Sequence, residues 1–279
     1  MNNDTTQRRR LRAHYGYGRL PFNKKMWAQQ MFDSTSQRDL LAGLHMWTEI
    51  RGLALVTGPS GVGKSITLRR FVSELDDARF RVIDFVYLPT TVTGFLRSLC
   101  RALGLPMRRH TADLFDTAKV HLAAHEQELG AHPIVIIDDA EGLTVDVADA
   151  LRRLTSYDLD AEDRFSILIS GTEEVMTVLR HPTLDTWRNR VVYAQALRPF
   201  SNEDTRNYVR FHLERSDLSP HLFSDDAVKR LFQTSLGRPR VINQLATQAL
   251  VEAAVRGLEE IDGGFLKNVI DGHPLYASN

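Results

Sequence analysis

Residues 53–65 read LALVTGPSGVGKS, a short apolar run followed by the pattern G-x-x-x-x-G-K-S. The spacing of apolar residues from 66 to about 75 then predicts a helix. A strand, a glycine-rich loop and a helix in this order form the structural setting in which the pattern binds nucleotide phosphates. The alternative is a glycine-rich turn that binds nothing. The flanking strand and helix, and a second motif further along the chain, argue against it.

The residue types of this loop match the chemistry of a triphosphate. The glycines allow backbone conformations that turn successive N–H groups toward phosphate oxygens at a helix N-terminus. We expect Lys64 to neutralise the outer phosphates and the Ser65 hydroxyl to join the Mg²⁺ shell, so ATP and Mg²⁺ are the expected ligands. The expected nucleotide-binding residues of the loop are Gly58, Pro59, Ser60, Gly61, Val62, Gly63, Lys64, Ser65 and Ile66.

A second motif, PIVIIDD at residues 133–139, predicts a buried strand that ends in two carboxylates. In a parallel sheet such a strand presents them at the carboxyl edge, where the phosphate loop also lies. We expect Asp138 to hold the Mg²⁺ shell and Asp139 to orient the attacking water. Another predicted buried strand, 165–170, runs into Ser170-Gly171-Thr172. A hydroxyl here can bind the γ-phosphate or the lytic water, and it can equally cap a turn.

The remaining pattern predicts an α/β protein with a helical C-terminal part. Further strands are predicted at 80–88, which looks apolar enough to be buried in a parallel sheet, and near 191–193. Helices are predicted at about 40–50, 94–103 and 145–155, and then at 202–214, 224–235, 239–256 and 263–270. The change to helices alone near 197–200 marks a boundary. We therefore expect a five-stranded parallel sheet between helices in 46–200 and a helical lid in 201–279.

Residues 1–45 precede the predicted sheet domain. Residues 1–14 contain Arg8, Arg9, Arg10 and Arg12 and are expected to form a basic tail, which serves solubility or contacts a phosphate backbone. Residues 15–32 are rich in aromatic side chains. We expect this segment to fold onto the nucleotide domain and to form part of an adenine pocket.

Composition sets limits on the function. The chain has 279 residues with 35 basic and 35 acidic side chains, so nucleic-acid binding requires a local patch. Arg97 and Arg101 lie four residues apart on a predicted helix, and Arg108 and Arg109 follow it. This cluster is either a solvated face or a DNA contact. A single cysteine, Cys100, excludes an intramolecular disulfide and favours a reducing compartment. Without a long apolar run or a signal-peptide core, the chain is expected to be cytoplasmic and soluble, with no membrane partner.

Taken together, these motifs resemble those of an AAA+ ATPase, and more narrowly the branch that contains the transposition ATPases TniB and TnsC and the secretion ATPase ExeA. The resemblance extends from about residue 15 to about residue 271, and residues 235–243, SLGRPRVIN, are its most specific part. It implies that Arg240 is the lid arginine that reaches the phosphates. It also implies that Arg190, with Arg188 as an alternate, reaches the γ-phosphate of a neighbouring subunit, so a homo-oligomeric ring or filament is expected. Each arginine can instead form a surface ion pair.

The acidic motif departs from the family pattern Asp-Glu-Ala-Gln, because it reads Asp138-Asp139-Ala140-Glu141. The carboxylate expected to position water is one methylene shorter, and a displacement of about an ångström can cost orders of magnitude in rate. Hydrolysis is therefore expected to be slow or to involve Glu141, or ATP serves mainly as a switch.

Three functions compete. The first is a DNA-transposition regulator that assembles with ATP on double-stranded DNA, marks the target site and recruits a transposase and target-selection proteins. The second is a secretion-type assembly ATPase like ExeA, and the third is a stand-alone AAA+ module. By the resemblance, the four arginines Arg97, Arg101, Arg108 and Arg109 lie where AAA+ rings face their central channel, which supports DNA contact. The lack of a membrane segment favours the first reading over the second.

Overall fold

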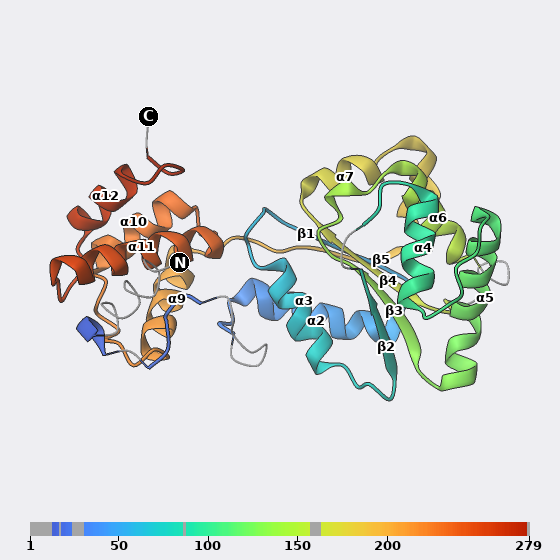
Figure 1. Ribbon diagram of the computed structural model, residues 1–279, viewed down its shortest axis with the longest axis horizontal. Coiled ribbons are helices and arrows are strands. Elements are labelled where there is room, and N and C mark those ends of the chain that lie inside the picture. Colours follow the sequence, from blue (N-terminus) through green and yellow to red (C-terminus); the bar gives the residue numbers. More distant parts are fainter. Residues whose placement is uncertain (1–12, 17, 24–30, 86–87, 157–162, 278–279) are drawn as a thin grey trace. The chain divides into compact units, whose positions relative to one another are not determined.

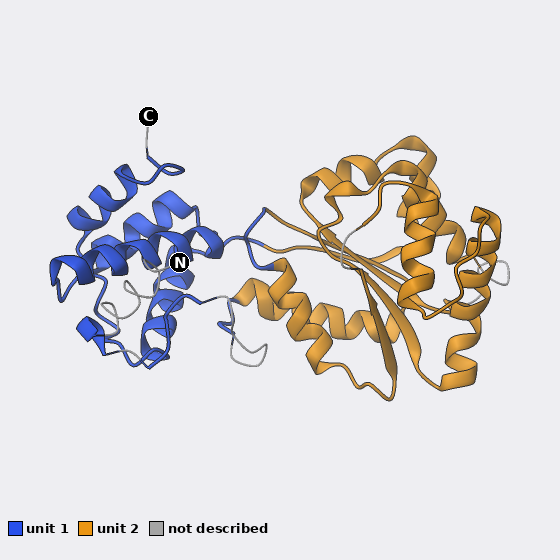
Figure 2. Cartoon of the chain, in the orientation of Figure 1, with its two compact units in different colours: residues 1–34, 60–63, 198–279 blue, residues 35–59, 64–197 orange. Residues whose placement is uncertain are grey.

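The computed structural model describes residues 13–16, 18–23, 31–85, 88–156 and 163–277. Most of the basic tail, with Arg8, Arg9, Arg10 and Arg12, lies outside this range, as does Trp27. The described residues form two compact units (Figure 2). Unit 1 takes its residues from 1–34, 60–63 and 198–279, and unit 2 consists of 35–59 and 64–197. Among the described residues, no helix has the length and apolar character needed to cross a bilayer.

Unit 2 is built on a five-stranded parallel sheet with the strand order β2-β3-β4-β1-β5 (Figure 1). The strands are β1 Leu53–Thr57, β2 Phe80–Asp84, β3 His132–Ile137, β4 Ser166–Gly171 and β5 Val191–Ala196. Every residue of β3 and β4 is buried, because helices cover both faces of the sheet. The carboxyl ends of β3, β4 and β1 therefore lie next to one another, in that order.

Helices lie on both sides of this sheet, with α2 and α3 on one side and α4 to α7 on the other (Figure 1). The apolar faces of these helices pack against the sheet. Leu40, Leu44 and Trp47 of α2 are fully buried. Threonine side chains cap two of the helices at their N-termini, Thr91 for α4 and Thr144 for α6. The helical elements are α2 Thr35–Ile50, α3 Lys64–Glu74, α4 Val92–Ala102, α5 Thr111–Leu129, η2 Ala140–Gly142, α6 Val145–Leu154, α7 Glu173–Leu179, η4 Pro182–Leu184 and α8 Asp185–Arg188.

Unit 2 differs from the sequence prediction at β2 and α5, and α7 and α8 were not predicted either. The strand expected at 80–88 ends at Asp84 and is not buried throughout, since Arg81 and Asp84 are exposed. The reason is its place at the edge of the sheet, where one strand neighbour is missing. The sequence analysis also missed α5, whose buried residues Leu114, Ala118 and Leu122 recur every fourth position. That spacing is the helical signal that was available.

Unit 1 contains the four helices predicted after residue 201, each within one residue of the expected bounds. They are α9 Asn202–Glu214, α10 Asp225–Ser235, α11 Pro239–Arg256 and α12 Gly263–Asp271. A reciprocal pair of side-chain bonds between Ser201 and Asp204 caps α9. The expected architecture of a parallel sheet between helices with a helical C-terminal part is thus confirmed.

The aromatic N-terminal segment packs in unit 1, so the expectation that it folds onto the nucleotide domain was wrong. Phe22 is 4% exposed and stacks on His212 of α9, with 5.0 Å between ring centroids. Phe32 makes edge contacts with Phe200, Tyr208 and Phe211, and the Tyr15 hydroxyl donates to the Leu258 carbonyl at 3.0 Å. The helices of unit 1 present an aromatic surface, and edge-to-face contacts with further rings cover it.

Candidate nucleotide-binding site

The phosphate loop leaves unit 2 at the end of β1 and returns to it at the start of α3. Lys64, the first residue of α3, is only 6% exposed, and its Nζ donates to the carbonyl oxygens of Gly58 at 2.8 Å and Pro59 at 3.4 Å. Ser65 and Ile66 follow in the first turn of the helix. Burying an ammonium is costly without compensating charge. A phosphate bound at the helix N-terminus supplies that charge.

The tip of the loop, residues 60–63, belongs to unit 1 and lies against Arg240 of α11. The Arg240 backbone N–H donates to the Gly61 carbonyl at 3.2 Å, and its guanidinium donates to the Ser60 hydroxyl at 3.3 Å. Gly61 has φ +78°, and a Cβ added there would lie 2.8 Å from the Arg240 Cβ. The loop needs glycine here for both its backbone conformation and this close approach. Unit 1 therefore brings the predicted lid arginine to the loop tip.

The carboxylates predicted at the end of β3 occupy different environments. Asp138 is half-buried, and its Oδ1 atom is buried and accepts no hydrogen bond from the described residues. Asp139 is exposed and has φ 51°, a left-handed conformation that is unusual for a residue other than glycine. The tight turn after β3 thus sends the two neighbouring carboxylates in different directions.

The end of β4 contributes two hydroxyls beside Asp138. The Ser170 Oγ and Thr172 Oγ1 atoms are buried and have no hydrogen-bond partner in the described part of the chain. β4 pairs with β1, where Val56 is opposite Ser170, and also with β3, so these oxygens lie between the two motifs. A buried polar atom without a partner costs about 1–3 kcal/mol. Carboxylate and hydroxyl oxygens at the ends of β3 and β4 suit a hard divalent cation, and the buried ammonium after the neighbouring β1 suits a phosphate.

Glu141 has a role that the sequence did not reveal. It lies in the short turn η2 after Asp139, and its Oε1 accepts the backbone N–H of Thr172 at 2.8 Å. The bond joins the turn after β3 to the turn after β4. No spacing rule connects two residues that are 31 positions apart, so only the structure shows this contact.

Comparison with known proteins agrees with this geometry. Residues 48–179 match the family model described as "AAA domain". The fold is shared with solved structures that align with most of this chain. The chain has the P-loop AAA+ fold. This fold and the domain match imply nucleotide binding and suggest ATPase activity.

General secretion pathway protein A of Aeromonas hydrophila is 28% identical over 254 residues, which are 90% of this chain and 46% of that protein. The chain thus spans about half the length of this curated relative. Among solved structures with the AAA+ fold, Cdc6p from Pyrobaculum aerophilum has a TM-score of 0.67 at 20% identity and covers 90% of this chain and 69% of its own. ORC2 from Aeropyrum pernix, in a complex with ADPNP and ADP, has a TM-score of 0.66 at 12% identity over 92% and 72%. The AAA+ and ExeA-like parts of the resemblance are supported, whereas the link to TniB and TnsC stays a prediction.

The arginines expected to act across an interface have partners within their own unit of the AAA+ fold. Arg190 donates to the Thr155 hydroxyl at 3.0 Å. Arg188 donates to the carbonyl oxygens of Leu179 at 3.1 Å and His181 at 3.4 Å, and it also pairs with Asp185. To contact the nucleotide of a neighbouring subunit, the Arg188 or Arg190 side chain must therefore break these hydrogen bonds and form new ones with the phosphate.

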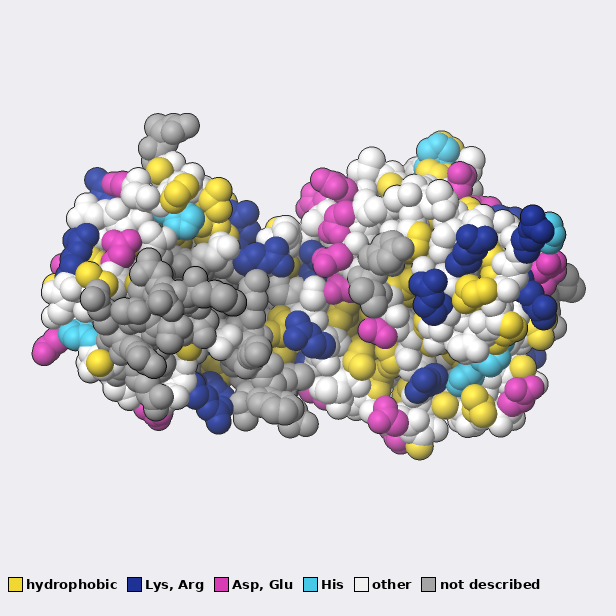
Figure 3. All heavy atoms as spheres, in the orientation of Figure 1, with side chains coloured by type: hydrophobic (Ala, Val, Ile, Leu, Met, Phe, Trp, Pro, Cys, Tyr) yellow, Lys and Arg dark blue, Asp and Glu magenta, His cyan; other side chains and the backbone are white. Residues whose placement is uncertain are grey.

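The four arginines predicted to contact DNA are exposed, and the described residues offer them no hydrogen bond or ion pair. Arg97 and Arg101 lie on α4, and Arg108 and Arg109 lie between α4 and α5. Figure 3 shows Lys and Arg side chains spread over this part of unit 2. Their charge is thus available to an anionic partner.

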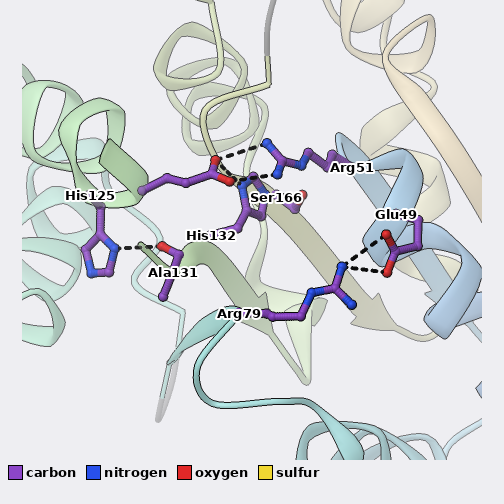
Figure 4. Close-up of polar contacts among 8 residues, drawn as sticks. Glu49, Arg51, Arg79, His125, Ala131, His132 and Ser166 are labelled. Atoms are coloured by element: carbon purple, nitrogen blue, oxygen red, sulfur yellow. Dashed lines mark hydrogen bonds and ion pairs between the residues drawn. The ribbon is translucent and has the colours of Figure 1, made fainter. Parts of the chain in front are cut away.

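A polar network that the sequence analysis missed lies at the opposite, amino edge of the AAA+ sheet (Figure 4). His132 is 2% exposed and lies between the Glu126 carboxylate, at 3.1 Å, and the Ser166 hydroxyl, at 2.9 Å. Arg51 donates two hydrogen bonds to Glu126, at 2.7 and 3.0 Å. Burial lowers the pKa of His132 and so favours the neutral ring. Burial alone would raise the pKa of Glu126, but hydrogen bonds from Arg51 and His132 lower it overall.

The order Glu126, His132, Ser166 resembles a hydrolase triad, but Ser166 is only 1% exposed and a substrate cannot reach it. We therefore interpret the network as structural. It ties the end of α5 to the first residues of β3 and β4.

Proposed function

We propose that the protein binds ATP with Mg²⁺, hydrolyses it, and uses the nucleotide to control assembly with further copies of itself, as an assembly ATPase of the secretion type. The observation that carries this proposal is a group of buried oxygens of Asp138, Ser170 and Thr172 at the strand ends, which have no hydrogen-bond partner among the described residues, together with the buried ammonium of Lys64. The similarity to General secretion pathway protein A over 90% of this chain supports the secretion-type reading.

Each residue has a role in this proposal. Lys64 would neutralise phosphate oxygens, and Ser65 and Asp138 would hold the Mg²⁺ shell through hard oxygen ligands. Arg240 keeps the role of lid arginine that the resemblance implies. Thr172 offers its hydroxyl to the γ-phosphate or the lytic water, and Asp139 orients that water. When bound, Mg²⁺ and ATP supply the γ-phosphoryl group and the charge that polarises it.

Replacement of Lys64 tests the proposal. We expect Lys64→Ala to lower ATP affinity at least 100-fold and to abolish ATP-dependent assembly, because the charge that offsets the triphosphate is removed. Fluorescence titration with an ATP analogue and light scattering measure the two effects. Lys267→Ala removes an exposed lysine of α12 and serves as the control. Unchanged ATP affinity in the Lys64 variant would contradict the assignment.

A DNA-transposition regulator is the second candidate, and the exposed arginines Arg97, Arg101, Arg108 and Arg109 are the observation that favours it. In this reading, an ATP-dependent assembly on double-stranded DNA recruits a transposase and target-selection proteins. A neighbour with the same fold, ORC1 of Aeropyrum pernix, was solved in complex with DNA, at 16% identity and a TM-score of 0.59. One subunit offers few phosphate contacts, so the electrostatic attraction becomes large only in an assembled row of subunits.

The salt dependence of DNA binding tests this second candidate. Each neutralised phosphate adds about −0.9 to the slope of log K against log salt, and the affinity should not depend on duplex sequence. We expect ATP-dependent binding and a shallower slope in Arg97→Ala/Arg101→Ala. The control Arg69→Ala/Arg180→Ala removes the same charge from exposed positions elsewhere in unit 2. If no nucleotide condition gives DNA binding, the transposition reading fails and the assembly ATPase stands.

A further inference from the structure

Glu141 and Thr172 connect the two turns beside the buried oxygens that have no hydrogen-bond partner in the described part of the chain. Glu141 lies in η2, two residues after Asp139, and Thr172 directly follows β4 as the N-cap of α7. The 2.8 Å bond from the Thr172 N–H to Glu141 Oε1 therefore fixes the end of β4 relative to the acidic turn.

The Thr172 side chain is not used in the way that a threonine at this position usually is. An N-cap threonine normally accepts a backbone N–H of its own helix. Here the Thr172 side chain makes no capping bond, and its Oγ1 is buried without a hydrogen-bond partner in the described chain. The residue is held through its backbone by Glu141, which leaves its hydroxyl for another partner.

Close packing makes the position of one turn depend on that of the other. A Cβ added to Gly171 would lie 2.4 Å from Val175 Cγ2 and 3.6 Å from the Ala140 backbone nitrogen, and Ala140 is fully buried. The end of β4 thus lies directly against the first residue of η2. The left-handed Asp139, with φ 51°, directly precedes Ala140 and so lies in this contact region.

From these contacts we infer that Glu141 is a positioning residue, which holds Thr172 and the Asp138–Asp139 turn in register for ATP hydrolysis. This inference rests on the proposed ATPase function and assigns Glu141 a different role from activation of water. Its Oε1 acts as the acceptor for a backbone N–H, and any acceptor of the same shape can replace it. Asp139 remains the residue for the attacking water.

Two substitutions separate the roles. Glu141→Gln keeps an Oε1 acceptor and removes the charge, whereas Glu141→Ala removes the acceptor. We expect Glu141→Ala to lower kcat for ATP at least tenfold while KM changes by less than about threefold, because misplacement of about an ångström costs rate more than binding. We expect Glu141→Gln to restore kcat to within threefold of the parent. The exposed Glu174→Ala of α7 is the matched control.

A second readout uses the nucleotide-free protein. Exchange of the Thr172 amide proton, followed by NMR, should be at least tenfold faster in Glu141→Ala than in the parent, and slow again in Glu141→Gln. If the parent hydrolyses no ATP, the proposed function fails and the exchange rates still decide whether Glu141 holds Thr172. The inference is overturned if Glu141→Gln is as inactive as Glu141→Ala. Parental kcat in Glu141→Ala, or unchanged Thr172 exchange in that variant, also overturns it.

Discussion

At the scale of single residues, the protein loses folding stability by burying polar atoms of Asp138, Ser170 and Thr172. Each buries an oxygen that finds no hydrogen-bond partner among the described residues, and such an atom costs about 1–3 kcal/mol. Sequence reasoning predicted that these residues gather at one edge, because buried parallel strands end together. It could not predict the hydrogen bond that the Thr172 N–H donates to Glu141, which depends on how two turns pack.

Asp139 should control turnover more than binding, since its expected partner is the attacking water. We expect Asp139→Asn to bind ATP within about threefold of the parent, to hydrolyse it at least tenfold more slowly, and to remain assembled. Phosphate release and nucleotide titration measure the two properties, with exposed Asp116→Asn of α5 as the control. If Glu141→Gln stops hydrolysis and Asp139→Asn does not, the two roles are reversed.

The motif at residues 235–243 contains both an expected ligand-binding residue and a structural one, and the sequence does not distinguish them. The resemblance directs attention to Arg240, which does lie at the loop tip. Gly237 of the same motif has a structural function: its φ is +70°, and an added Cβ would lie 2.0 Å from the Phe200 carbonyl oxygen. Its own carbonyl accepts the Phe200 N–H at 2.8 Å. A motif alone does not separate these two kinds of residue.

At the scale of elements, end signals and periodic pattern together determined which predictions succeeded. The helices α9, α10 and α12 have side-chain N-caps at Ser201, Ser224 and Asp262, whereas α11 begins with Pro239 and ends before Gly257, and the bounds of all four were predicted closely. In α5 the buried positions include Ala118 and His125, so its apolar face is weak in sequence. β2 looked like a central strand because its composition is apolar. Which strand lies at the edge is set by the strand order, and the residues of β2 do not encode it.

The buried His212 of α9 predicts an acid-sensitive unit 1. Burial lowers its pKa to about 4, with a smaller effect of the Arg215 charge, whereas the unfolded value is 6.5. Between these values the unfolded chain binds more protons, so the free energy of unfolding falls as pH drops from 6.5 toward 4. The loss from this one group is on the order of 3 kcal/mol.

Urea unfolding at pH 7 and pH 4.5 measures this effect. His212→Phe keeps a ring beside Phe22 and removes the titrating group, so this variant should lose less stability on acidification. His221→Phe replaces an exposed histidine of unit 1 and is the control. An equal loss in the parent and in His212→Phe would assign the acid sensitivity to other groups.

At the scale of the whole molecule, the chain contributes to its two units in alternation. It enters unit 2 after residue 34, contributes residues 60–63 to unit 1, and returns to unit 1 after residue 197. The sequence pattern showed the last change, because strands stop there. The pattern did not predict that residues 15–32 pack in unit 1. Their aromatic residues have no helical or strand spacing, so they could pack on any apolar surface.

If several copies assemble with ATP, we expect Arg190 of one copy to contact the ATP bound to its neighbour. Arg190→Ala should bind ATP but not hydrolyse it, and mixing it with Lys64→Ala should restore some activity, because one kind of mixed interface has both intact halves. ATP hydrolysis of the mixture, compared with each variant alone, is the measurement. Arg188→Ala tests the alternate in the same way. If no mixture of folded variants is active, the bond from Arg190 to Thr155 is its function.

The packing of Phe22 with Phe200, Tyr208 and Phe223 in one core has a consequence for synthesis on the ribosome. Phe22 is translated before the helices of unit 1 that supply the aromatic side chains around it. At about 5–20 residues per second, Phe22 waits roughly 10–40 seconds for Phe200. Throughout that interval its ring is open to other nascent chains and to chaperones that bind exposed aromatic side chains. A ring that is translated early is thus buried only after the helices of unit 1 have been made.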